Sequence, residues 1–249
     1  MSRARRGERR RDWVVGVNSV LAVLESGSRK AYKLLISRGE KDRNTENIIK
    51  VAEGMGIQVD YTDRRYIEEQ TGTYPHQGIA LLVERFRFTD IETIVEISKR
   101  DKSPIVMLDG VEDPRNLGAI IRTSEAIGAS GLIIRKARQS PITTVVAKSA
   151  EGALEYLPIS QVPNLAGALR KMKDEGIWAV CLEEDASDDI RDVDIPSPFI
   201  LIAGSEGRGV SRLLYELSDF SVRIPITGRT PSLNVNVAVG IALFYLNKV

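Results

Sequence analysis

The sequence has little of two residues that commonly build sites: one cysteine, Cys181, and one histidine, His76, among 249 residues. One cysteine excludes an internal disulfide. One cysteine and one histidine are too few ligands for a Cys/His zinc site, so no metal is expected. No apolar run approaches the roughly 20 residues that span a bilayer. We therefore expect no membrane insertion and a location in the reducing cytoplasm. Cys181 lies in the apolar run 178–182, which predicts a small buried side chain.

Net charge is also scarce, since 35 Lys and Arg residues face 34 Asp and Glu residues. The distribution of charge is more informative than its sum. The first eleven residues carry six arginines and a single opposing acid, Glu8, where the arginines are Arg3, Arg5, Arg6, Arg9, Arg10 and Arg11. Such an arm either neutralises RNA phosphates or is a solvated tail, and the sequence alone favours neither.

Composition along the chain predicts a flexible basic arm and two α/β domains. The arm covers residues 1–12, a small domain covers 13–84, a charged helix-prone linker covers 85–102 and a larger domain covers 103–249. In the small domain we expect a helix at 16–24, capped by Asn18 or Ser19, and a second helix at 44–55. Strands are expected at 33–37, 58–61 and 77–83.

Strands and helices alternate from residue 103 onward. Strands are predicted at 105–108, 132–134, 157–159, 178–182, 199–203 and 222–226, and helices at 117–127, 143–150, 165–175, 210–217 and 234–246. This alternation predicts a mainly parallel sheet with helices on both faces. Ligands bind beyond the carboxyl ends of such strands, so the loops after Leu108, Ala203 and Ile226 are the candidate site.

The first of these loops, residues 109–122, leads into a helix. Asn116 stands where a helix N-cap belongs, and capping alone would explain it. Arg122 falls off the apolar stripe of the helix and is therefore free to take part in chemistry, although most arginines simply face solvent.

The second loop, residues 201–210, places glycines at positions 204, 207 and 209 after a strand. Glycines there permit close backbone approach to a ligand, but the spacing matches neither a Walker loop nor a dinucleotide fingerprint. Glu206 at the centre would repel a phosphate. A cofactor with cationic or neutral hydrogen-bonding groups therefore fits the loop better.

The third loop, residues 224–243, leads from a polar turn into a helix that is apolar on nearly every side. Such a helix is expected to be buried. Ser232, Asn234 and Asn236 are each good helix starters, so capping explains one of them. It does not explain three polar residues in front of a buried helix.

These three loops resemble motifs 1, 2 and 3 of the SpoU family of RNA 2′-O-ribose methyltransferases, in the family's order and spacing, over about residues 103–249. Residues 13–84, with the segment 74–78, resemble the L30e-like substrate-binding domain of the RlmB type within that family. The resemblance implies an α/β catalytic domain with a deep trefoil knot, a homodimer, and S-adenosylmethionine as cofactor.

The resemblance also implies roles for individual residues. Matching the motifs assigns a catalytic pocket to Asn116, Arg122, Glu206, Ser232 and Asn234. It assigns cofactor binding to Ala203, Gly204, Ile224, Ile226, Ser232 and Leu233. Family proposals make the motif 1 arginine a base, but arginine stays protonated in proteins. We therefore expect Arg122 to hold the ribose and stabilise its developing negative charge.

The implied reaction is methyl transfer from S-adenosylmethionine to the ribose 2′-hydroxyl of a guanosine in 23S rRNA. Two alternatives remain open. One keeps the chemistry but acts on a tRNA guanosine, or on an rRNA adenosine as in the thiostrepton-resistance enzymes. The other is a non-catalytic RNA-binding protein of ribosome assembly, which the five pocket residues argue against.

Overall fold

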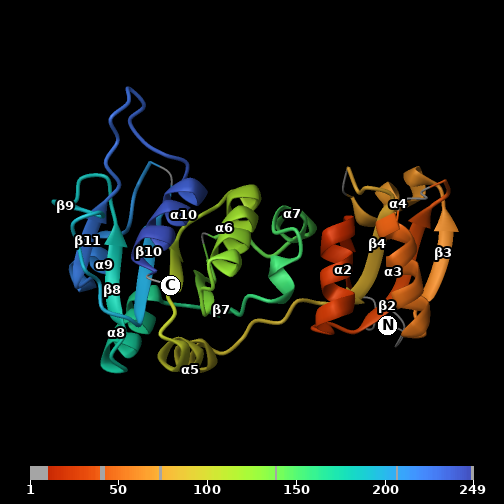
Figure 1. Ribbon diagram of the computed structural model, residues 1–249, viewed down its shortest axis with the longest axis horizontal. Coiled ribbons are helices and arrows are strands. Elements are labelled where there is room, and N and C mark those ends of the chain that lie inside the picture. The colour runs from red at the N-terminus through yellow and green to blue at the C-terminus, as the bar shows by residue number, and fades with distance from the viewer. Residues whose placement is uncertain (1–10, 40–42, 73–74, 138, 206, 248–249) are drawn as a thin grey trace. The chain divides into compact units, whose positions relative to one another are not determined.

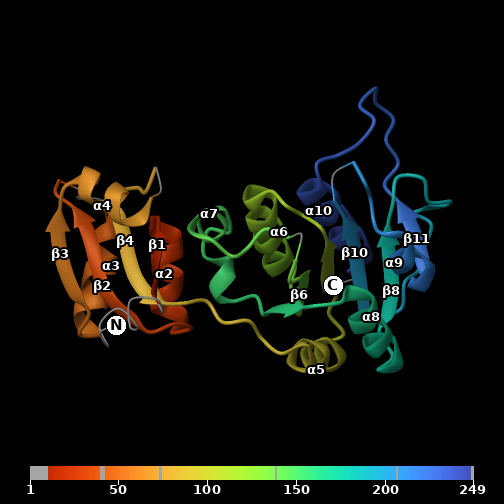
Figure 2. The ribbon, with the colours of Figure 1, turned by 180° about the vertical axis from the view of Figure 1, so that it is seen from behind.

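The protein, examined as a computed structural model, is described here over residues 11–39, 43–72, 75–137, 139–205 and 207–247. It divides into two compact units (Figures 1 and 2). Residues 1–87 and 142–156 fall in the first unit, and residues 88–141 and 157–249 in the second. The predicted arm at residues 1–12 lies almost entirely outside the described residues.

The first unit is built on a four-stranded sheet with strand order β1-β4-β2-β3. Its elements are β1 (Arg11–Val15), α2 (Val17–Ser26), β2 (Ala31–Ser37), α3 (Arg43–Gly54), β3 (Gln58–Thr62), α4 (Arg64–Thr71) and β4 (Ile79–Glu84). Three predicted strands and two predicted helices are present with shifted ends. The predicted cap at Asn18 or Ser19 is wrong, because helix α2 begins after Gly16, whose φ of 95° favours glycine.

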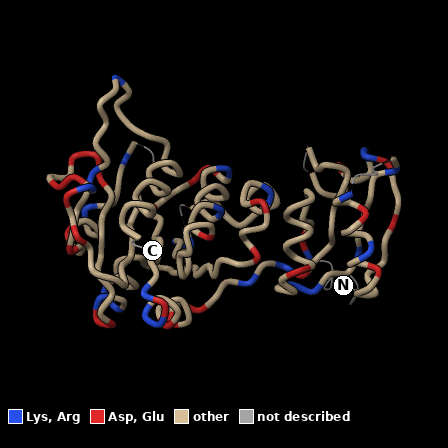
Figure 3. The backbone as a smooth tube through the Cα atoms, viewed as in Figure 1, with Lys and Arg blue, Asp and Glu red and all other residues tan. Residues whose placement is uncertain are grey.

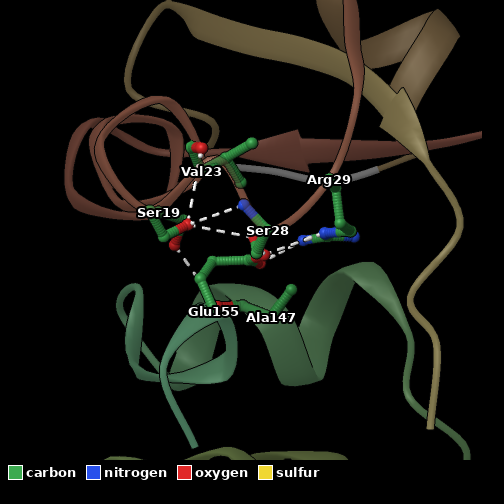
Figure 4. A network of polar contacts seen from close by, with 7 residues as sticks. Ser19, Val23, Ser28, Arg29, Ala147 and Glu155 are labelled. Atoms are coloured by element: carbon green, nitrogen blue, oxygen red, sulfur yellow. Dashed lines mark hydrogen bonds and ion pairs between the residues drawn. The ribbon is translucent and has the colours of Figure 1, made fainter.

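Two short helices later in the chain pack with this first unit, namely α7 (Thr144–Ser149) and η1 (Ala153–Glu155). The Arg29 guanidinium pairs with the Glu155 carboxylate, and both side chains are almost fully buried. Ser28 donates a 2.6 Å hydrogen bond to the same carboxylate, and Ser19 donates to the Ala147 carbonyl (Figure 4). A buried ion pair is costly unless both groups are well hydrogen-bonded. Because only one arrangement of residues 142–156 keeps these bonds, the contacts define how that segment packs on the first unit.

The second unit contains a seven-stranded sheet in which every observed strand pair is parallel, with strand order β7-β6-β5-β10-β8-β11-β9. Its strands are β5 (Ile105–Asp109), β6 (Gly131–Arg135), β7 (Ile159–Val162), β8 (Trp178–Leu182), β9 (Asp188–Asp189), β10 (Phe199–Gly204) and β11 (Phe220–Arg223). The predicted α/β class with a mainly parallel sheet is confirmed. The predicted strand 157–159 begins only at Ile159, and the predicted strand 222–226 ends at Arg223.

Helices cover both faces of this sheet, as expected for buried parallel strands. They are α5 (Ile91–Asp101), α6 (Pro114–Ala126), α8 (Leu165–Asp174), α9 (Arg212–Leu217) and α10 (Val235–Leu246). Side chains of α5, α8 and α9 share one apolar cluster, while α6 and α10 lie side by side (Figures 1 and 2). Cys181 is fully buried in that cluster as predicted, and burial raises the pKa of its thiol to about 12.

The C-terminal helix α10 departs from expectation. It buries Val239 and Leu243, but Phe244 is 75% exposed and Tyr245 is 52% exposed. Val237 is also exposed. The prediction that this helix is buried is therefore wrong for one side of it in the single chain, because α6 and the sheet cover only the other side.

Candidate functional site

The loops predicted to carry chemistry meet at the carboxyl edge of the second unit's sheet. Strand β10 lies between β5 and β8, and Gly204 is in register with Asp109. Strand β11 pairs with the other side of β8. The chain segments that leave β5, β10 and β11 therefore emerge at one edge of the sheet, with the end of β8 between the last two, and this edge is where parallel sheets bind ligands.

A cavity of about 350 Å³ opens at this edge. All six residues predicted to bind a cofactor line it: Ala203, Gly204, Ile224, Ile226, Ser232 and Leu233. Apolar side chains form part of the wall, and the loop backbone forms another part. The volume lies in the range of small-molecule sites.

Two glycines let the second loop fold tightly against this cavity. A Cβ on Gly204 would lie 1.9 Å from the carbonyl carbon of Gly209. Gly209 has a φ of +63°, and its Cβ would lie 2.7 Å from Oε2 of Glu183. No larger residue fits at position 204 without moving the backbone, and at position 209 a side chain would be strained by the positive φ and would displace the Glu183 carboxylate.

Three acidic residues that the sequence interpretation did not assign to the site also line this cavity: Glu183, Glu184 and Asp185. They follow β8, and Figure 3 shows further acidic residues gathered beside β9. Glu183 accepts a hydrogen bond from the Val210 N–H. Burial raises the pKa of Glu183, an effect that the Val210 hydrogen bond opposes. The acidic loop was visible in the sequence, but the position of β8 beside β10 was not.

A neighbouring carboxylate anchors the other end of the same loop. Asp109, at the end of β5, accepts a 2.9 Å hydrogen bond from the Ser211 N–H. Its second oxygen lies 3.0 Å from the Arg135 guanidinium. Glu183 and Asp109 thus hold two consecutive backbone N–H groups from opposite sides of β10.

A second cavity of about 220 Å³ adjoins the first. Ser205, Arg208 and Val235 line both cavities. The remaining wall of the second comes from the first loop and its helix, with Gly110, Val111, Glu112, Asp113 and Asn116. A group bound in one cavity would therefore lie next to a group bound in the other.

A chain of hydrogen bonds joins the first and third loops. Asn234 is the N-cap of α10, and its Oδ1 accepts from the Asn236 N–H at 3.0 Å. Its Nδ2 donates to Oδ1 of Asn116 at 3.2 Å, and Asn236 Nδ2 approaches the same oxygen at 3.4 Å. Of the three polar residues, Asn234 is a cap as predicted, Ser232 lines the first cavity and Asn236 contacts Asn116.

Asn116 itself is not a cap, and that prediction is wrong. The N-cap of α6 is Asp113, whose side chain accepts from the Arg115 N–H at 2.7 Å. Pro114 occupies the first helical position, where its missing N–H costs nothing. Asn116 therefore lies within the first turn, buried and turned toward Asn234.

Of the remaining predicted pocket residues that the structure describes, only one is brought to the cavity walls. Ser232 lines the first cavity. Arg122 is exposed on α6, about 9 Å along the helix axis from Asn116, and the walls assigned to the two cavities in the described chain do not include it. Glu206 lies outside the described residues. Within those residues, no group of three or more His, Cys, Asp and Glu is placed to hold a metal ion.

Comparison with known families matches both parts of the chain. The family described as SpoU rRNA Methylase matches residues 103–244. The family described as RNA 2′-O ribose methyltransferase substrate binding matches residues 13–89. The two matches follow one another in sequence and leave only residues 90–102 between them.

Relatives and solved structures agree with these matches over nearly the full length. The putative TrmH family tRNA/rRNA methyltransferase YacO of Bacillus subtilis is 37% identical, over 94% of each chain. The 23S rRNA (guanosine-2′-O-)-methyltransferase RlmB of Shewanella oneidensis is 34% identical, over 95% of this chain and 96% of its own. An AdoMet-bound rRNA methyltransferase from Sinorhizobium meliloti is 28% identical with a TM-score of 0.78, over 98% of this chain and 89% of its own.

Proposed function

Because the chain belongs to the SpoU rRNA Methylase family, we propose that it transfers a methyl group from S-adenosylmethionine to the ribose 2′-hydroxyl of a guanosine in 23S rRNA. The observation that carries the proposal is the convergence of three loops on two adjoining cavities. Similarity to an RlmB enzyme supports the guanosine and the 23S rRNA. Only RNA presents a 2′-hydroxyl, so RNA is the substrate class.

The first cavity fits the cofactor in shape and in charge. Apolar residues such as Leu233 and Ile226 suit an adenine ring, and the glycines of the tightly folded loop that line the cavity permit a ligand to approach the backbone closely. The carboxylates of Glu183 and Asp185 suit the positive charges of a sulfonium and an ammonium group. When bound there, the cofactor supplies an electrophilic methyl group.

The protein's own task is to bring the acceptor oxygen into line and to stabilise its charge. Correct alignment alone can lower such a barrier by on the order of 7–11 kcal/mol. We assign the second cavity to the target nucleotide, because it shares a wall with the cofactor cavity. Arg122 is proposed to hold the ribose and adjacent phosphate and to stabilise the developing alkoxide.

The other pocket residues are proposed to orient these groups. Asn116, Ser232 and Asn234 come from two loops that the amide hydrogen bonds hold together. Glu206 is proposed to orient Arg122, together with Asn116. Fixed amide partners suit this role because a preorganised polar group needs no rearrangement during the reaction.

We further propose a homodimer and a deep trefoil knot for the catalytic domain. Support for the dimer comes from α10, where Val237, Phe244 and Tyr245 expose apolar surface on one helix. An exposed apolar patch on a soluble domain commonly marks an interface. The position of Arg122 away from the cavity walls also suits a site to which a second copy brings residues.

The proposed domain plan is an arm at 1–12, an RNA-binding domain at 13–84, a linker at 85–102 and a catalytic domain at 103–249. The arm and the RNA-binding domain would provide phosphate contacts and site choice. The cytoplasm is the proposed location. The helices within the described residues are all too short or too polar to cross a membrane.

The test is incubation of the protein with methyl-labelled cofactor and either unmodified 23S rRNA or unmodified tRNA. Transfer to 23S rRNA supports the proposal, and transfer to tRNA alone supports the first alternative. Binding of the cofactor, measured by calorimetry, separates an enzyme from a ribosome-assembly protein without activity. No cofactor binding and no transfer to either RNA would overturn the proposal.

A further inference from the structure

The sheet of the first unit is covered unequally on its two faces. One face packs against α2 and α3, and buries residues such as Val14, Leu34 and Leu81. On the other face the short helix α4 covers a small cluster around Ile67, and the partly exposed Trp13 packs against the edge of this cluster. Figures 1 and 2 show α4 near one end of this sheet. The other end of that face is left without a helix among the described residues.

A row of partly exposed side chains crosses this open end. Trp13 of β1 is opposite Leu82 of β4, and Leu82 is opposite Lys33 of β2. All three are partly exposed, whereas their neighbours Val14, Leu34 and Leu81 on the other face are buried. Strand alternation therefore presents an indole, an aliphatic chain and an ammonium side by side.

A second aromatic ring lies beside this row with cations around it. Arg11 is two residues before Trp13 and so points to the same face. Its guanidinium carbon lies 3.9 Å from the centre of the Tyr32 ring. Lys30 Nζ lies 5.6 Å from the same centre. The ladder shifts register between Ala31 and Lys33, which frees Tyr32 from the regular alternation.

We propose that this surface, the open-face platform, binds a single-stranded segment of the substrate RNA by stacking a base on Trp13, beside the cations that Tyr32 holds. The platform consists of Arg11, Trp13, Lys30, Tyr32, Lys33 and Leu82. Aromatic rings interleaved with cations suit unpaired bases and their phosphates, because every base has a face that stacks. The inference rests on the proposed function for its RNA partner.

The charges near the platform favour this partner. The acids close by are paired with cations: Asp60 with Lys33, Glu84 with Arg87 and Asp12 with Arg85. Arg11 and Lys30 add positive charge at the open end. In the sequence, Arg11 directly follows the arginine-rich segment 3–10. The basic arm thus leads into the platform, which fits a polyanion better than an apolar partner.

Tryptophan fluorescence tests the platform directly, since the chain has only two tryptophans, Trp13 and Trp178. The Trp178→Phe variant leaves Trp13 as the single reporter. Titration with a single-stranded RNA oligonucleotide should quench Trp13 emission, and a duplex of the same sequence should quench it less. Binding of the oligonucleotide without any change in Trp13 emission would overturn the proposal.

Substitutions separate stacking from packing. Trp13→Leu keeps an apolar side chain but removes the aromatic face, and should weaken oligonucleotide binding about tenfold. Trp13→Phe should stay close to wild type. Equal affinities for these two variants, both folded by circular dichroism, would contradict stacking.

A charge-matched pair tests the phosphate contacts. Lys30→Gln, which removes an exposed platform cation, should lower the salt dependence of binding by about 0.7 in the log–log slope. Lys50→Gln removes the same charge from the exposed side of α3, away from the platform, and should leave the slope unchanged. Equal slopes for both variants would argue against the platform.

Failure of the platform is distinguishable from failure of the proposed function. If Trp13→Leu binds RNA like wild type while the wild-type protein methylates 23S rRNA, only the platform is wrong. If the wild-type protein neither binds cofactor nor transfers methyl groups, the proposed function is wrong, and the fluorescence titration still decides the platform.

Discussion

The side-chain amide of Asn234 donates a hydrogen bond to Oδ1 of Asn116 across 118 positions of sequence, and so joins the third loop to the first. Asn234 also caps α10 through its own Oδ1. One residue therefore fixes the start of a helix and the orientation of a pocket amide. This double use explains why the two loops keep a common geometry at the site.

That relationship predicts an asymmetry between two similar substitutions. Asn116→Asp keeps the acceptor that Asn234 needs, whereas Asn234→Asp keeps the cap but replaces the donor with a carboxylate facing Asn116 Oδ1. Asn234→Asp should lower the free energy of unfolding by about 1–3 kcal/mol, and Asn116→Asp by less. Urea denaturation measures both, and equal losses would contradict the assigned hydrogen bond.

Substitution of a glycine should have opposite outcomes in the second and third loops. Gly204→Ala places a Cβ within 2 Å of the Gly209 backbone, so the loop must move and cofactor affinity should fall at least tenfold. Gly228→Ala meets nothing within 4 Å and should bind as wild type does. Calorimetry with S-adenosylmethionine makes the comparison. Retained affinity in Gly204→Ala would place the cofactor elsewhere.

Glu183 predicts a pH dependence of stability. Its pKa is raised in the fold, chiefly by burial, so the folded state binds its proton more tightly than the unfolded state. The cost of ionising it is absent below the unfolded value of 4.5 and grows as pH rises through the folded pKa. Glu183→Gln, which can still accept from Val210, should therefore gain stability over wild type as pH rises above 4.5. Parallel stability curves for the two proteins would refute this.

The role proposed for Arg122 predicts that its substitution affects turnover but not cofactor binding. Arg122→Ala should lower kcat by at least a hundredfold, because it removes charge stabilisation needed only during the reaction. Its affinity for S-adenosylmethionine should stay within about twofold of wild type. Arg115→Ala, an exposed arginine of the same helix, is the control and should keep both values. Equal loss of turnover and affinity would show a binding role instead.

The exposed face of α10 predicts the oligomeric state. Phe244→Ser should convert a dimer to a monomer in light scattering, because Phe244 is 75% exposed in the single chain. Leu213→Ser changes an exposed apolar residue on α9 and should leave the dimer intact. A wild-type monomer, or a dimer that survives Phe244→Ser, would contradict this interface.

Local patterns in the sequence predicted the second unit's sheet well. Continuous apolar runs such as 178–182 and 199–203 mark buried parallel strands, because both faces of such strands are covered. The loops that follow β5 and β10 could therefore be predicted as parts of the site. The alternation of strands with helices indicates a parallel sheet, and the carboxyl ends of its strands lie at one edge.

Features that depend on distant pairing could not be predicted in this way. Strand order is a long-range property, so the sequence did not reveal that Glu183 at the end of β8 would hold the loop after β10. The docking of Glu155 on Arg29, 126 positions away, is hidden for the same reason. Apolar content likewise could not tell which side of α10 the sheet covers.

The chemistry of the modified nucleotide tests the central claim most directly. A methyl group on the ribose 2′-oxygen blocks alkaline cleavage of the adjacent phosphodiester, whereas a methyl group on a base does not. After transfer of labelled methyl groups to 23S rRNA and alkaline hydrolysis, we predict that the label is recovered in an alkali-resistant dinucleotide that contains guanosine. Label recovered in mononucleotides as a methylated base would contradict the account.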